Sequence, residues 1–320
     1  MTSIAPESLA ATLVSEGVLI RTSVDGVYGQ GAVFATIADG VSQAIRRHTA
    51  MGAERMRFAS VMARSDLERI GYFRNFPHLL GTIHCFCGDE AQHRESVRLH
   101  DSGEAWDDRL KATDLVLIPA ACYPVYAALA RRGSMPAAGY TVQVEANCFR
   151  REPSTDPVRL QSFHMQEIVR VGRADDVAAF RDSWLTSGAA LLSSWGLGGA
   201  VEPADDPFFG RAAVVMAKAQ RAQELKFEWK TVVSDRAKPT ACMSGNYHLD
   251  SFGRALGMTL PDGSPAHSAC VGFGIERITL ALLGQHGPHP ADWPPLVRQS
   301  LRLAPCGDGE VAEAGQLAST

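Results

Sequence analysis

Apolar residues recur at helical spacing in three stretches of the chain. In residues 32–48 they fall on every fourth position, which predicts a helix with one buried stripe. In residues 175–195 large apolar side chains again share one helical face, and Gly196 ends the pattern. Residues 211–225 are only weakly amphipathic, and we expect them to form a helix inside an insertion at residues 205–225.

Shorter alternating stretches predict strands. They lie at residues 56–62, 79–86, 227–233 and 238–246, in a long hairpin at 141–171, and in a strand that continues as a helix at 267–283. Polar residues 88–114 indicate exposed helix and loop, and apolar residues 115–130 a buried strand or turn. Since strands and helices do not alternate regularly, we predict an α+β fold with helices flanking an antiparallel sheet. Residues 1–303 should form this single domain and residues 304–320 a loose tail.

The hairpin carries polar side chains where a buried strand would continue with apolar ones. In its first strand Arg150, and Glu152 beyond it, share the parity of the apolar positions 142, 144, 146 and 148. In the return segment one face carries the cationic, aromatic and acidic residues Arg159, Phe163, Met165 and Glu167. Guanidinium groups match phosphate oxygens, and an aromatic ring offers a stacking surface for a base. A nucleotide site and a solvated ladder of ion pairs both fit this pattern.

Composition narrows the class of protein. The chain has 320 residues, with 31 Lys and Arg against 35 Asp and Glu, and its net charge of −4 disfavours broad nucleic-acid binding. Its seven cysteines are an odd number without a signal peptide, which favours reduced thiols and a cytoplasmic protein. Prolines interrupt the most apolar run, so no membrane span is expected.

One group of thiols and histidines stands out as a possible metal site. His84, Cys85, Cys87 and His93 lack a second pair at matching spacing, so we interpret them as structural residues. Cys122 and Cys270, taken from the residues alone, suit buried apolar thiols.

A second polar constellation lies at residues 268–277. Cys270, Gly272 and Gly274 share one face of the predicted strand, and glycine there lets a ligand approach the main chain. Arg277 falls in the first turn of the following helix, where free amides already favour an anion. The alternative is a tight strand–helix junction with a surface arginine.

These stretches together resemble the class II aminoacyl-tRNA synthetases. Residues 149–152, Phe-Arg-Arg-Glu, resemble motif 2, and residues 272–277, Gly-Phe-Gly-Ile-Glu-Arg, resemble motif 3. The resemblance is narrower at residues 121–124, 166–169, 244–248 and 269–272, which look like those of the amino acid:carrier-protein ligases, relatives of the atypical seryl-tRNA synthetases of methanogens. It covers nearly the whole chain.

The resemblance implies a set of site residues. Zinc would be held by Cys122, Glu167 and Cys270, leaving a fourth position for the substrate's α-amino group. ATP would contact Arg150, Glu152, Arg159, Leu160, Phe163, Ala241, Ser244 and Arg277, with Arg150 and Arg277 as the catalytic pair. Glu167, Ser244 and Asn246 would bind the amino acid.

The sequence departs from the synthetase pattern in two places. No proline ends the strand near residues 58–62, as motif 1 requires, although we still expect the homodimer that motif 1 supports. No acidic residue lies in 238–246, where a magnesium ligand is usual, so Glu152 or Glu228 would have to serve.

The predicted activity is ATP-dependent activation of a small amino acid, glycine or alanine, followed by transfer to the phosphopantetheine thiol of a carrier protein. Two alternatives stay open: a reduced seryl-tRNA synthetase that charges tRNA, and a non-catalytic paralogue that binds amino acid or nucleotide. The acidic net charge and the lack of an appended basic domain disfavour tRNA. The retained arginines and thiols disfavour the paralogue.

Overall fold

The computed structural model describes residues 6–49, 52–133, 135–233 and 238–303. Its centre is a seven-stranded sheet in the order β3-β7-β8-β12-β11-β10-β9. These strands are Glu54–Arg57 (β3), Tyr140–Phe149 (β7), Ser162–Gly172 (β8), His267–Gly274 (β12), Thr240–Tyr247 (β11), Lys226–Thr231 (β10) and Gly199–Pro203 (β9). All neighbours are antiparallel except β3 and β7. The predicted α+β fold is therefore confirmed.

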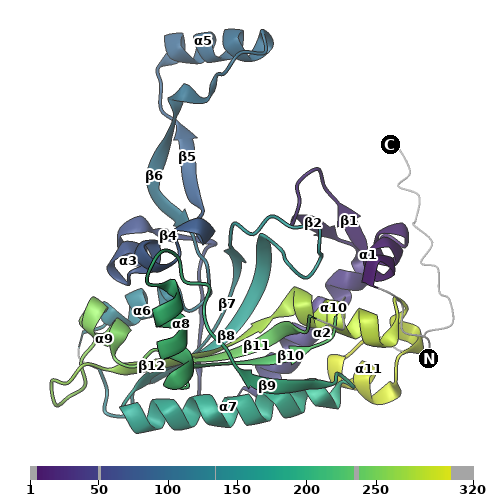
Figure 1. Cartoon of the computed structure of the whole chain (residues 1–320), viewed down its shortest axis with the longest axis vertical. Helices are drawn as coiled ribbons and strands as arrows, with labels where there is room; N and C mark the ends of the chain where they lie inside the picture. Colours follow the sequence, from purple (N-terminus) through teal and green to yellow (C-terminus); the bar gives the residue numbers. More distant parts are fainter. Residues whose placement is uncertain (1–5, 50–51, 134, 234–237, 304–320) are drawn as a thin grey trace, which may run out of the picture.

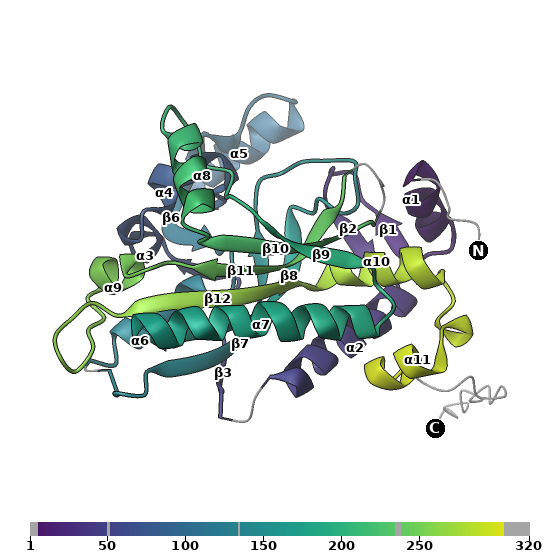
Figure 2. The same cartoon turned by 60° about the horizontal axis from the view of Figure 1, so that its bottom comes forward.

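Helices cover one face of this sheet. They are α2 (Ala32–His48), α7 (Ala174–Ser194) and α10 (Ile275–His286), and α7 runs along the sheet below β12 and β11 (Figures 1 and 2). Fully buried Ile37, Ile168 and Leu192 bring α2, the sheet and α7 into one apolar core. This core fixes the back of the sheet and leaves the other face for the site.

A second apolar core lies on the opposite face, towards one end of the sheet. It joins β7 and β8 to α6 (Tyr123–Ala130) and α9 (Ser251–Leu256) through buried side chains such as Val144, Val169 and Tyr126. Pro124 stands in the first turn of α6, where its missing N–H leaves no intrahelical bond unmade. Helix α8 (Ala213–Ala222) stands above this region (Figure 1).

A long arm projects from the body of the molecule (Figure 1). It grows out of a three-stranded sheet in the order β4-β6-β5, made of Val61–Ala63, Leu110–Leu117 and Thr82–Phe86. Helix α5 (Glu90–Asp101) forms its tip, and Asp89 caps it by accepting from the main-chain nitrogen of Gln92 at 2.8 Å. Beside the base lie the short helices α3 (Arg64–Arg69) and α4 (Tyr72–Asn75).

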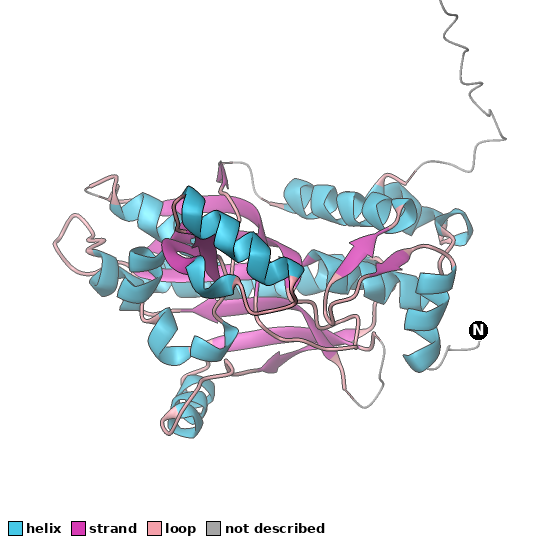
Figure 3. Cartoon of the chain, turned by 90° about the horizontal axis from the view of Figure 1, so that it is seen from above, coloured by secondary structure: helices cyan, strands magenta, loops and turns pink. Residues whose placement is uncertain are grey.

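Smaller elements complete the other end of the molecule. They are α1 (Pro6–Ser15), the hairpin of β1 (Leu19–Arg21) and β2 (Tyr28–Gln30), and α11 (Pro295–Leu301), all at the end opposite α6 and α9 (Figures 1 and 3). No helix in the described ranges is both long and apolar enough to span a lipid bilayer.

The structure confirms the predicted helices α2, α7 and α8, the long hairpin and the β12–α10 junction, and corrects four stretches. Residues 56–62 split between β3 and β4, which belong to different sheets. Residues 110–114 begin β6, whose exposed faces carry no apolar alternation. Residues 123–130 form a helix rather than a strand or turn. Strand β9 was missed because all of its residues are exposed. The predicted loose tail, 304–320, lies outside the described residues, and the single-domain boundary stays a prediction.

Candidate active site

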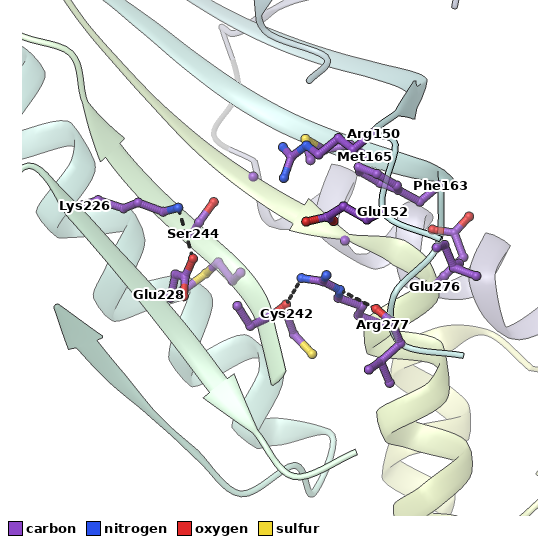
Figure 4. A pocket seen from close by; sticks show the side chains of 16 residues that line it. Arg150, Glu152, Phe163, Met165, Lys226, Glu228, Cys242, Ser244, Glu276 and Arg277 are labelled. Atoms are coloured by element: carbon purple, nitrogen blue, oxygen red, sulfur yellow. Dashed lines mark hydrogen bonds and ion pairs between the residues drawn. The ribbon is translucent and has the colours of Figure 1, made fainter. Parts of the chain in front are cut away.

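A cleft opens on the face of the sheet that α2 and α7 leave free. It measures about 660 Å³, part of it open to solvent, and lies between the ends of β7 and β8, the strands β10 to β12 and the start of α10. In Figure 4, Arg150, Met165 and Phe163 lie along one side of it. Lys226, Glu228 and Ser244 lie across from them, and Arg277 reaches in from α10. The motif 2 and motif 3 stretches therefore meet in one cavity.

Arg150 directly follows β7 at the wall of this cleft. Its Nε donates to the main-chain oxygen of Pro119 at 2.9 Å, and its guanidinium carbon lies 5.4 Å from the centre of the Phe163 ring. Within the described residues it forms no ion pair with a carboxylate. A half-buried cation held by a carbonyl and an aromatic face is arranged to receive an anion.

Arg277 forms the second cationic wall, from the first turn of α10. Its Nε donates to the oxygen of Val158 at 2.9 Å and its Nη1 to that of Ala241 at 3.1 Å. Burial lowers its pKa below the ordinary value, and again no carboxylate among the described residues pairs with it. Together with the helix N-terminus, this arginine favours a phosphate group.

The cleft between the two arginines suits a base and its phosphates. Phe163, Leu160 and Val158 line it with apolar surface, and Gly272 and Gly274 expose main chain on the β12 side. A Cβ added at Gly272 would lie 3.3 Å from the Cγ of Glu167, so glycine also preserves the space beside that carboxylate. An apolar wall that faces exposed main chain suits a flat aromatic ring.

Acidic groups and one lysine line the far side of the cleft. Lys226 is buried, and its Nζ lies 3.1 Å from Glu228 and 2.7 Å from Asp206. Burial alone would raise the pKa of Asp206, but the nearby ammonium of Lys226 lowers it. Glu152, on the motif 2 side, also lines the cleft. Carboxylates on two sides of a polyphosphate site are the oxygen ligands that magnesium prefers.

The residues implied as zinc ligands come together at the inner end of the sheet. Atoms of Cys122, Glu167 and Cys270 lie within 4.8 Å of one another, and all three side chains are buried. The main-chain nitrogen of Cys122 donates to Glu167 Oε1 at 3.0 Å. A thiol hydrogen bond to Cys270, together with burial, raises the pKa of Cys122 well above its ordinary value. Two sulfurs and one carboxylate fit the donor set of a zinc site with three protein ligands.

Further polar groups surround this cluster. Asn246 Nδ2 lies 3.7 Å from the Cys270 sulfur and 3.4 Å from Ser244 Oγ, so Asn246 joins the cluster to the cleft. His248 Nε2 lies 3.9 Å from the same sulfur, and burial lowers the histidine's pKa to about 4, which keeps the imidazole neutral. Ligand sites are usually supported by such a second layer of hydrogen bonds.

A second cavity, of about 990 Å³, is lined by His248, the imidazole beside the Cys270 sulfur. It lies between α4, α8, α9 and the end of β11, and aromatic side chains including Tyr72, Tyr123 and Phe252 line it. Asp206 lies in its wall and holds Lys226, which lines the first cleft. The two cavities therefore approach each other around Asp206, Lys226 and the thiol cluster.

Glu276 is a site residue that sequence reasoning did not single out, although it stands in the motif 3 stretch. It is buried, and its two carboxylate oxygens accept from the main-chain nitrogen of His164 at 2.8 and 2.9 Å. Gln30 donates to it at 3.2 Å, and burial raises its pKa to about 7. Because the β8–β12 ladder ends at Met165 and Gly274, this carboxylate supplies the next partner for β8. It thereby fixes Phe163 relative to Arg277.

The structure brings most of the predicted site residues together. Seven of the eight residues assigned to ATP line the cleft, namely Arg150, Glu152, Leu160, Phe163, Ala241, Ser244 and Arg277. Arg159 does not, because it is exposed in the loop before β8. The thiols Cys85 and Cys87 are exposed on the arm, and among the described residues they belong to no three-ligand group. Lys226 was missed, although its parity with Glu228 in β10 gave the signal.

No family model matches the chain, but curated proteins do. It is 44% identical over 279 residues to amino acid–acyl-carrier-protein ligase 2 of Bradyrhizobium diazoefficiens, covering 87% of this chain and 84% of that one. Ligase 1 of the same organism is also 44% identical, over 284 residues. The chain belongs to the amino acid–acyl-carrier-protein ligase family. It is accordingly a ligase, as the motifs predicted.

More distant relatives confirm the fold. Type-2 serine–tRNA ligase of Methanococcus aeolicus is 30% identical over 156 residues, which is 46% of this chain and 29% of that one. Among solved structures, M. kandleri SerRS in complex with A. aeolicus tRNASec has a TM-score of 0.77 at 18% identity. The match spans 92% of this chain and 60% of that one. A prolyl-tRNA synthetase from Giardia lamblia has a TM-score of 0.68. These likenesses establish the class II synthetase fold.

Proposed function

We propose that the ligase activates a small amino acid, glycine or alanine, with ATP and transfers it to the phosphopantetheine thiol of a carrier protein. One observation carries the proposal. Arg150 and Arg277 line a single cleft, both without carboxylate partners in the described chain, and the Cys122–Glu167–Cys270 cluster lies beside it. A site for a polyphosphate thus adjoins a site for an amine.

In the first step a carboxylate oxygen of the amino acid attacks the α-phosphorus of ATP, and pyrophosphate leaves. Arg150 stabilises the charge that develops on the α-phosphoryl oxygens, and Arg277 holds the γ-phosphate. Phe163 stacks on adenine, with Glu152, Leu160, Ala241 and Ser244 completing the nucleotide site. Positioning and electrostatics are the main contributions available, since no protein group needs to become covalently bonded.

Glu167, Ser244 and Asn246 form the proposed amino-acid site. Zinc held by Cys122, Glu167 and Cys270 would supply a Lewis-acidic position for the substrate's α-amino group. Asn246 lies next to Cys270 and Ser244, so it can orient the same substrate. Glu152 and Glu228 are our candidates for magnesium ligands at the phosphates, because both line the cleft.

In the second step the phosphopantetheine sulfur attacks the carbonyl carbon of the aminoacyl adenylate. A thioester forms, AMP leaves, and the thiol proton is lost to solvent. The 990 Å³ cavity offers the thiol a route to the cluster that the nucleotide does not occupy. Its aromatic walls suit the apolar parts of the pantetheine arm.

Helix α8 is our candidate for the docking site of the carrier. Val214 and Val215 are more than half exposed on it, and Arg211 and Lys218 add positive charge that suits an acidic carrier. Arg221 is already paired with Asp205 and serves as the matched control. Charge reversal at Arg211 and Lys218 should slow carrier aminoacylation and leave pyrophosphate exchange unchanged. Equal carrier kinetics in these variants would exclude this helix.

We also propose a homodimer, as the class II resemblance implies. Strand β3 is the outer strand of the sheet, and in the described chain no strand pairs with its free edge. Free edges and basic hollows such as the one beside β3 are places where a second chain can bind. Sedimentation of the pure protein tests this directly.

Amino-acid-dependent ATP–pyrophosphate exchange, screened over all amino acids with zinc measured in the same samples, tests the activation step. Exchange with glycine or alanine, followed by thioester formation on a phosphopantetheinylated carrier, is the expected result. Absence of exchange with every amino acid would favour the non-catalytic alternative. Charging of tRNA by the same preparation would instead favour the synthetase alternative, which the acidic net charge disfavours.

A further inference from the structure

The arm, residues 82–114, has almost no buried surface of its own. Among its side chains only Ser96 is buried, and neither apolar core of the body includes an arm residue. Phe86, Val97 and Trp106 are each at least 40% exposed. A two-stranded ribbon that packs on nothing is only marginally stable in water, so large exposed side chains on it point to a binding partner.

The charge of the arm restricts that partner. The arm contains eight Asp and Glu residues against four Lys and Arg, a net charge of −4, which equals that of the whole chain. The remainder of the chain is therefore neutral on balance. An arm of this charge repels nucleic acid and an acidic carrier protein alike, and it favours a basic surface.

A basic surface of matching size is present in the chain itself. Residues 46–49 and 52–74 carry seven arginines against three acidic residues, a net charge of +4. They form the end of α2, strands β3 and β4 and helices α3 and α4, and β4 belongs to the sheet from which the arm grows. Arg46, Arg55 and Arg57 line a hollow of about 570 Å³ at β3, where Glu145 pairs with Arg46 and Arg57 and no carboxylate in the described chain pairs with Arg55.

The arm cannot cover this surface in its own chain. It points away from the body (Figure 1), and the one ion pair between the two segments in the described chain, Arg64 to Asp114 at 3.6 Å, lies at its base. In a two-fold pair, by contrast, the arm of each copy can reach the basic segment of the other. Both contacts then form at once, because the interface is self-complementary.

We infer that the arm is a clasp for a second copy of this chain, with its acidic, apolar surface bound to the partner's basic segment. This inference rests on the proposed homodimer and adds to it the element that holds the two copies together. Phe86 and Trp106 supply the large side chains that dominate interface energies, and the charges set the orientation.

A shortened arm tests the inference. His84 and Ala112 lie opposite each other in β5 and β6, so replacing residues 85–111 by Asn-Gly closes the ribbon with a two-residue turn. Sedimentation velocity should show a dimer for the full chain and a monomer for the shortened one, and cooperative urea unfolding should show that the shortened chain is folded. A dimeric shortened chain would overturn the clasp and leave the homodimer standing. A monomeric full chain would overturn the homodimer and the clasp with it.

Charge reversal provides a second test that keeps the arm intact. Asp107→Lys with Asp108→Lys on the arm, or Arg55→Glu on the basic segment, should raise the dimer dissociation constant at least tenfold, and combining them should restore part of the loss. Asp262→Lys, in an exposed turn outside both segments, is the matched control. Unchanged dissociation constants in both reversals would contradict the clasp. Unchanged dimerisation with slower carrier aminoacylation would assign the arm to the carrier instead.

Discussion

The chain contains two long antiparallel ribbons with opposite surroundings. Strands β7 and β8 lie inside the seven-stranded sheet, where Val142, Val144 and Ile168 are buried and the ends of the strands build the cleft. Strands β5 and β6 project into solvent and bury almost nothing. We therefore assign the packed ribbon of β7 and β8 to the chemistry of the cleft. We assign the exposed ribbon of β5 and β6 to association between two copies of the chain. Matched substitutions in the two ribbons can separate these roles.

Removal of a thiol from the Cys122–Glu167–Cys270 cluster should have the largest effect on activity. Removal of a thiol from the arm should have none. Cys270→Ala deletes one of three proposed zinc ligands, so we expect loss of bound zinc and a fall of at least a thousandfold in amino-acid-dependent exchange, or ~4 kcal/mol. Cys85→Ala, at an exposed thiol, should change neither. Metal analysis and exchange rates measure both. Full zinc content in Cys270→Ala would rule out the cluster as the zinc site.

Truncation of an apolar side chain should lower the free energy of unfolding much more in β8 than on the arm. Ile168 is fully buried in β8, and Ile168→Ala should lower the free energy of unfolding by about 3.5 kcal/mol through lost burial and a cavity. Val97 is 44% exposed on α5, and Val97→Ala should change it by less than about 0.5 kcal/mol. Urea unfolding of the two variants, at a protein concentration where association is constant, provides the comparison. Similar losses would mean that the arm is packed in solution.

Removal of an arginine should lower the exchange rate at the end of β7 and leave it unchanged on the arm. Arg150→Ala should cost about 3 kcal/mol of transition-state stabilisation, roughly a hundredfold or more in exchange rate, because the developing charge loses its donor. Arg98, on α5, pairs only with acidic neighbours on the arm, and Arg98→Ala should leave exchange unchanged. Wild-type exchange in Arg150→Ala would remove this arginine from the proposed mechanism.

The free energy of unfolding should depend on pH through the ionisation of Glu276, the carboxylate that binds the start of β8. Its pKa of about 7 in the folded protein lies above its ordinary value of 4.5, so the folded state binds the proton more tightly. The stabilisation is complete below pH 4.5 and is lost as the pH rises through 7, a change of up to about 3 kcal/mol. Glu276→Gln cannot ionise, and its unfolding free energy should vary less over this window. Parallel curves for the two proteins would refute the assignment.

How much the sequence could predict differs between the two ribbons for a physical reason. In β7 one face must be apolar, so the alternation and the polar residues that interrupt it are visible, and Arg150, Phe163 and Glu167 could be found from them. In the first part of β6, residues 110–114, neither face is buried, so no period exists to read, and that part of the strand was missed. Helix α6 was missed because Pro124 looks like a breaker unless its place in the first turn is known.

The cluster shows a further limit. Cys122, Glu167 and Cys270 come from three separate segments, and nothing in their spacing indicates that they meet. Only the family resemblance placed them together, and the pairing of β8 with β12 explains why they do, since Cys270 lies opposite Val169 and Gly272 opposite Glu167. Glu276 was overlooked because its partner is a main-chain nitrogen, which no side-chain pattern reveals.

The parallel pairing of β3 with β7 has a consequence for how the chain folds and diversifies. Glu54 lies opposite Val142, and the arm falls within the loop that this pairing must close. Because closure entropy grows only with the logarithm of loop length, removing the arm would shorten the loop by about a third and change the closure free energy by only about 0.4 kcal/mol. The pairing of β3 with β7 therefore costs nearly the same closure free energy with or without the arm. Selection is free to lengthen, shorten or recharge the arm without disturbing the topology that holds the cleft.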